Sequence, residues 1–156
     1  MLSSVLTFVR LPFLLILIWT VARFSLGLAG VPYAPRGNAM FSIVGLTYIS
    51  SVYFGALSGR VGGFDWKGTA LVGAVLGLFS QILIFIATVV SVAGGLDTSY
   101  FLHWDALNVP EGTTVSMGQA VGIRVTGIIA NTVIGTILAL IGRALGGLAP
   151  KSAQTA

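Results

Sequence analysis

Two arginines hold most of the chemistry that this sequence could carry out inside a membrane. Arg23 and Arg124 interrupt long apolar runs, where an ionisable side chain is costly and therefore indicates a function. Counted from the expected outer ends of their helices, both lie on the order of 10–13 Å deep at the helical rise per residue. Gln81 and Tyr48 are expected within about two turns of that level. These four residues form the predicted ligand-binding set.

The sequence leaves three interpretations of the arginines open. Each guanidinium could reach lipid phosphates, or pair with Asp97, Asp105 or Glu111 in the loop above it. Alternatively, the arginines face an outward-opening cavity together with Gln81 and Tyr48. Such a cavity would bind an anion or the polar head of a lipid or quinone, because a guanidinium stays charged and offers forked donors. In the third interpretation a partner protein contacts them.

Residues suited to catalysis are few. The chain has no cysteine, one histidine and four carboxylates. His103 alone excludes a multi-histidine metal site within one chain, and a capping or exposed role is favoured over a cofactor ligand. No glycine-rich phosphate loop and no Ser–His–Asp motif spacing occurs, and no carboxylate interrupts an apolar run as a proton relay requires. We expect no catalytic residues, no metal, no cofactor and no enzyme activity.

The composition predicts that membrane helices position these residues. Of the 156 residues, 56% are hydrophobic and only 8% are charged, against about 25% in soluble domains. Mean hydropathy is +1.00. The twelve charged residues, eight basic and four acidic, are too few to cover the surface of a soluble domain. The lipid bilayer is therefore the expected surroundings of a single all-α membrane domain spanning residues 1–156.

Apolar runs predict a four-transmembrane-helix bundle. The expected helices cover about 11–29, 38–58, 68–95 and 115–143. The first must continue through Arg23, because the uncharged stretch from Leu11 to Ala22 is too short to cross a bilayer as a helix. A cleaved signal peptide is the alternative for this segment, disfavoured by Arg23 and by the lack of a small-residue cleavage site.

The connection 97–114 is predicted to lie on the outer side and to hold a short amphipathic helix at the membrane interface. Its mixture of aromatic and polar side chains favours a surface where another protein docks. The candidate docking residues are Tyr100, His103, Trp104 and Asp105.

The distribution of charge predicts the orientation. With four spans both termini share a side with the second connection, and that side carries five basic residues against Asp65. These are Arg10, Arg60, Lys67, Arg143 and Lys151. The positive-inside rule then places both termini in the cytoplasm, for a bacterial protein at the inner membrane. This pattern explains the high pI without nucleic acid, and anionic lipid is the expected partner.

Small residues at four-residue spacing predict close helix packing. They lie on several helices, and one stripe on the last helix is a candidate face for other transmembrane subunits or a second copy. Its residues are Gly118, Gly122, Gly127, Asn131 and Gly135. The similar segments 56–60 (ALSGR) and 139–143 (ALIGR) indicate either duplication of a two-helix hairpin or chance in a chain rich in Ala, Leu and Gly.

The sequence favours a non-enzymatic membrane subunit or scaffold that packs against other transmembrane proteins. The alternative is a ligand-handling protein that uses the intramembrane arginines. It would bind an anion, lipid or quinone head group, or form a small homo-oligomeric channel or transporter. A glycine stripe facing lipid would favour the subunit, whereas a cavity lined by Arg23, Gln81 and Arg124 would favour ligand handling.

Overall fold

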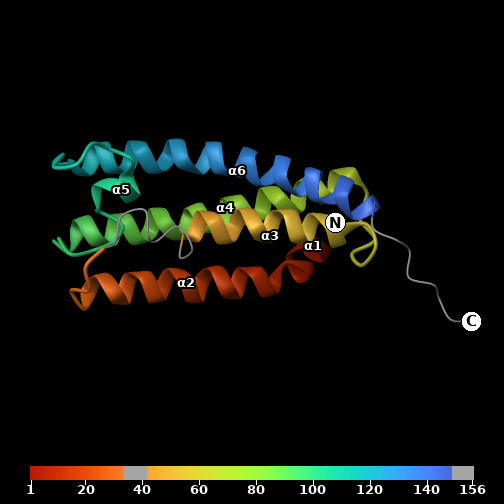
Figure 1. Ribbon diagram of the computed structural model, residues 1–156, viewed down its shortest axis with the longest axis horizontal. Helices are drawn as coiled ribbons and strands as arrows, with labels where there is room; N and C mark the ends of the chain where they lie inside the picture. The colour runs from red at the N-terminus through yellow and green to blue at the C-terminus, as the bar shows by residue number, and fades with distance from the viewer. Residues whose placement is uncertain (34–41, 149–156) are drawn as a thin grey trace, which may run out of the picture.

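The computed structural model describes residues 1–33 and 42–148. Within these ranges every regular element is a helix, and the long helices lie lengthwise as a bundle (Figure 1). The helices are α1 (Leu2–Phe8), α2 (Arg10–Leu28), α3 (Ile43–Ser58), α4 (Trp66–Ala93), α5 (Trp104–Leu107) and α6 (Met117–Leu148).

Three helices, α2, α4 and α6, are long and apolar enough to cross a membrane. They suggest an integral membrane protein, as the composition predicts. Helix α3 is also apolar but has 16 residues. The start of the second predicted span, about 38–58, falls partly within 34–41, outside the described residues, so a fourth span stays a prediction.

The backbones of α3, α4 and α6 approach until they touch. A Cβ built on Gly73 of α4 would lie 2.3 Å from the Gly135 carbonyl oxygen of α6, and one on Gly142 of α6 would lie 2.0 Å from the Val52 carbonyl oxygen of α3. No side chain fits at either glycine. Because lipid supplies no hydrophobic drive between helices, contact of this kind is the main source of packing energy.

Helix α2 lies on the side of α3 and α4 away from α6 (Figure 1). The short helix α1 precedes it with a bend at Val9, which the sequence did not predict. Pro12 explains the bend, because it has no N–H to donate to the Phe8 carbonyl. The bend packs the Phe8 ring edge-on against Phe54 and Phe64, with centroids 5.4 and 5.3 Å away.

Helix α3 begins far from the end at which α6 begins (Figure 1). Tyr48 bonds to Asn131, yet Tyr48 lies in the second turn of α3 whereas Asn131 lies about four turns into α6. This offset means that α6 extends about 13 Å beyond the start of α3. Among the described residues, loop residues and cavities lie at that end of the bundle beside α6.

We expect Gly73→Ala to destabilise the protein by roughly 1–3 kcal/mol, the usual cost of overpacking a core, because its methyl would collide with the α6 backbone. Gly118→Ala on α6 is the control, since no described atom lies within 4 Å of a Cβ there. Unfolding by denaturing detergent measures both. Equal stability of the two variants would contradict the packing described here.

Candidate functional site

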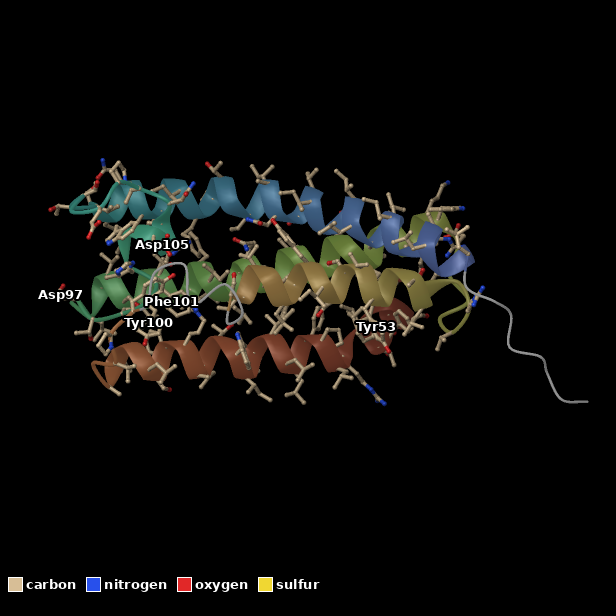
Figure 2. The ribbon with its side chains drawn as sticks, viewed as in Figure 1. Tyr53, Asp97, Tyr100, Phe101 and Asp105 are labelled. Carbon is tan, nitrogen blue, oxygen red and sulfur yellow. The ribbon has the colours of Figure 1, made fainter. Side chains whose placement is uncertain are left out.

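The residues after α4 fold back over the open end of the bundle. Figure 2 shows Tyr100, Phe101 and Asp105 gathered at the end opposite the N terminus, and Asp97 at its tip. The segment packs against α2 so tightly that a Cβ on Gly27 would lie 2.9 Å from the Tyr100 nitrogen. It ends in α5, a single helical turn in which the Asp105 amide donates to His103 Nδ1 at 3.2 Å.

Arg124 ties this segment to α4 and α6. Its Nε donates to Thr88 Oγ1 of α4, while Nη1 and Nη2 donate to the carbonyl oxygens of Ala106 and Phe101, each at 2.9 Å. All three acceptors are neutral, so these bonds orient the guanidinium without cancelling its charge. The arginine is held by backbone and hydroxyl oxygens instead of the carboxylates that the sequence offered as partners.

Arg143 makes the same kind of contact at the other end of α6. Its Nη1 donates to Thr69 Oγ1 of α4 at 2.9 Å and to the Phe64 carbonyl oxygen at 2.5 Å. Its guanidinium also lies 5.0 Å from the centre of the Trp66 ring. Arg124 and Arg143 of α6 therefore bond to Thr88 and Thr69 of α4, which runs antiparallel to α6. The spacing of the two arginines along α6 equals the spacing of the two threonines along α4. Each pair fastens the neighbouring connection to the bundle.

Arg23 reaches the same end of the bundle as Arg124, but from α2. Its guanidinium carbon lies 5.6 Å from the centre of the Tyr33 ring and 5.5 Å from that of Tyr100, within range of cation–π attraction. The Tyr33 hydroxyl donates to Asp105 Oδ2 at 3.2 Å, and its ring stacks on His103 at 4.0 Å between centroids. This aromatic cluster joins the end of α2 to α5.

Burial shifts the pKa of two residues in the cluster. It raises the pKa of the Tyr33 phenol, with nearby Arg23 acting in the opposite direction and Asp105 in the same one. It lowers the pKa of the His103 imidazole, against the opposing influence of Asp105 and Glu111. Both rings are therefore held in their neutral forms at neutral pH.

A cavity of about 310 Å³ lies between this cluster and the start of α3; we call it the arginine cavity. Among the described residues, its wall holds Arg23, Arg124 and one acidic residue, Asp105. The other described wall residues are Tyr33, Ser42, Ile43, Val44, Ile84, Tyr100, Phe101 and Ala106. Two positive charges against one negative charge make this wall electropositive.

A second cavity, of about 730 Å³, runs along the inner face of α6; we call it the glutamine cavity. It shares Val44, Ile84, Ala106 and Arg124 with the arginine cavity. Most of its other wall residues are aliphatic or small, and the polar ones are Gln81, Asn108, Thr113, Gln119, Thr126 and Asn131. Arg124 therefore stands where the two cavities adjoin.

The structure brings the four predicted ligand-binding residues to these cavities by different routes. Arg23 and Arg124 line the arginine cavity, and Gln81 and Arg124 line the glutamine cavity. Tyr48 lines neither, but its hydroxyl donates to Asn131 Oδ1 in the wall of the glutamine cavity. Ligand binding by this set stays a prediction.

Some residues of the predicted partner face on α6 contact other helices of this chain, and others do not. Gly135 contacts α4, and Gly127 faces the Gln81 side chain. Asn131 bonds to Tyr48 of α3. Within the described residues, only Gly118 and Gly122 of this set have no atom within 4 Å of a built Cβ, so they alone leave room for a neighbouring helix.

The predicted docking residues of the loop differ in their exposure. Tyr100 is 4% exposed and packs within the chain, whereas His103, Trp104 and Asp105 are partly exposed. Docking of another protein on them stays a prediction.

Sequence reasoning missed Tyr33, Thr88 and Arg143. Thr88 could have been found, because it lies seven residues after Gln81 and so shares its helix face. Tyr33 could not, since its role depends on how the loop after α4 folds back. In the sequence, Arg143 served only as one of the positive charges that predict the cytoplasmic side.

Comparison with known proteins gives no assignment: no family model, no curated protein and no solved structure matches this chain.

We expect Arg124→Gln to loosen residues 98–107, because three charged-donor hydrogen bonds are lost, each typically worth about 1.5–3 kcal/mol. A local loss on the order of 2 kcal/mol or more should appear as faster amide hydrogen exchange there. Arg143→Gln is the matched control and should loosen residues 59–66 instead. Equal loosening at both ends in either variant would contradict separate anchoring.

We expect α5 to open as the pH falls below about 6.5, the ordinary pKa of histidine. Because burial lowers the pKa of His103, the opened segment takes up a proton more readily than the folded one, so acid favours opening. A protonated Nδ1 also cannot accept from the Asp105 amide. Hydrogen exchange at 103–108, corrected for intrinsic rates, tests this between pH 7.5 and 5.5.

The matched variant is His103→Asn, which keeps a cap acceptor without a titrating group. It should hold α5 closed across this range. Acid opening that is the same in both proteins would show that another group controls it.

Proposed function

We propose that the chain is a multi-pass, non-enzymatic membrane protein that binds an anionic or strongly polar head group in the arginine cavity. One observation carries the proposal: Arg23 and Arg124, from two different helices, line one cavity, and the one carboxylate in its described wall, Asp105, accepts a bond from Tyr33. Charge is costly inside a membrane, so an excess positive charge facing a cavity favours an anion as its counterpart.

The use of the small residues also supports ligand handling over assembly. Most glycines of the predicted stripes pack against the chain's own backbones, among them Gly55, Gly73, Gly77, Gly142 and Gly146. These glycines make contacts within the bundle, so few glycines of the predicted stripes remain available to contact a partner helix.

We propose four spans with both termini cytoplasmic, in a bacterial inner membrane. The N terminus, the α3–α4 connection and the C-terminal end of α6 lie at one end of the bundle (Figure 1). That end carries Arg60, Lys67 and Arg143, whereas Asp97 and Glu111 follow α4 and precede α6 at the other. The positive-inside rule supports this orientation, in which the arginine cavity opens to the outer leaflet.

A subunit or scaffold role is the second candidate. It is favoured by an exposed aliphatic row on α6, including Val125, Ile129, Val133 and Ile137, next to the open Gly118 and Gly122. Native mass spectrometry of the protein in gently extracted membranes would show other polypeptides, or further copies of this chain, for such a role. A single chain carrying lipid would favour the head-group site.

We expect the wild-type protein in nanodiscs to retain phosphatidylglycerol over phosphatidylcholine in native mass spectra. Arg23→Gln should weaken that preference by about tenfold or more, because the anionic head group loses a charged partner. Arg10→Gln, on the same helix but at the other end of the bundle, is the control and should keep it.

Inorganic phosphate added as competitor separates a lipid site from a free-anion site. Competition by millimolar phosphate would indicate a free anion. No preference for the anionic lipid in the wild-type protein, or an equal loss in both variants, would count against the proposal.

A further inference from the structure

Gln81 is the most unusual polar group in the glutamine cavity. Its side chain is 4% exposed, and its Nε2 has no hydrogen-bond acceptor within the described residues. An amide donor that is buried without an acceptor is costly. Gln81 also lines the cavity, and a half-turn of its amide would place Nε2 where Oε1 now lies, beside Gly127 in the cavity wall, where an entering acceptor can meet it.

The neighbouring Asn131 and Tyr48 side chains are already engaged. Asn131 accepts from the Tyr48 hydroxyl through Oδ1, and its Nδ2 donates to the Gly127 carbonyl oxygen at 2.9 Å. The position that a Cβ of Gly127 would take lies 3.2 Å from Gln81 Oε1. Glycine at 127 therefore leaves the glutamine its space, and the asparagine amide is committed elsewhere. The donor of Gln81 differs from them in having no partner in the part of the chain that the structure describes.

The charged group of Arg124 and the hydrogen-bond donor of Gln81 lie at two levels along α4. Arg124 is held at Thr88, which lies seven residues, or about 10 Å along the axis, from Gln81. Ile84 lies between them and lines both cavities. In the proposed orientation the charged groups are nearer the membrane surface and the donor is deeper. A bilayer amphiphile has the same order: a charged head, then carbonyls, then an apolar chain.

We propose that the two cavities together take one anionic acyl lipid, with its head group at Arg23 and Arg124 and an ester carbonyl accepting from Gln81 Nε2. The glutamine cavity, about 730 Å³, is within the range of about 300–1,000 Å³ typical of ligand sites, and the aliphatic part of its wall suits the start of an acyl chain. This inference rests on the proposed head-group site and adds the carbonyl contact to it.

The experiment compares diacyl phosphatidylglycerol with its diether analogue, which keeps the head group and chains but has no carbonyl. Binding to the wild-type protein is measured by native mass spectrometry in mixed nanodiscs. We expect the diacyl lipid to bind about three- to tenfold more tightly, the change that one hydrogen bond typically makes. This comparison uses no variant, so it holds even where a substitution impairs folding.

Gln81→Leu should abolish the difference between the two lipids, since it removes the donor and keeps an apolar side chain. Ser80→Ala is the control. Ser80 precedes Gln81 on α4, is buried and lines neither cavity, and its Oγ donates to the Gly77 carbonyl oxygen, so we expect this variant to keep the preference for the diacyl lipid.

The outcomes separate this inference from the proposed function. Equal binding of diacyl and diether lipid by the wild-type protein, with phosphatidylglycerol still preferred over phosphatidylcholine, would overturn the carbonyl contact and leave the head-group site. A diacyl preference that survives in Gln81→Leu would also overturn it. Loss of all preference for phosphatidylglycerol in the wild-type protein would overturn both.

Discussion

Direct contact between the backbones of α3, α4 and α6 is the constraint on which the rest of the structure depends. Gly73 and Gly142 have no space for a side chain, so the three helices lie as close as peptide groups allow. In lipid, this proximity supplies the packing energy that water would supply to a soluble core. The three helices then form a core, with α2 at the side and the connections folded onto the ends (Figure 1).

The cavities follow from unequal helix lengths within that core. Helix α3 is half the length of α6, 16 residues against 32, and contacts its C-terminal half. Among the described residues, the loop after α4 covers part of the space beyond the start of α3, and Arg124 holds that loop through two backbone carbonyls. The same arginine thus fixes the loop and gives the cavities their charge. A structural role and a binding role need not compete, because the acceptors that orient the guanidinium are neutral.

A charged cavity that adjoins a larger one with a partly aliphatic wall suits an amphiphile better than a small ion. A small anion would use only the arginine cavity, leaving the donor of Gln81 unmet. A lipid would engage both, and its chain would continue into the bilayer on which the exposed aliphatic face of α6 borders. Under this proposal the protein binds a lipid of the bilayer that surrounds it, through a few polar groups held by rigid helices.

By itself, the sequence determined that the chain is helical, that its long helices are apolar enough to cross a membrane, and their approximate bounds. These follow from apolar runs and a fixed rise per residue, which are local properties. Only the tertiary structure decided that Arg124 bonds to carbonyls instead of acids, that Tyr33 joins the site, and that Gly135 faces α4. Such contacts depend on helix rotation and on where a loop folds back, because many pairings of small and apolar faces satisfy the same periodicity.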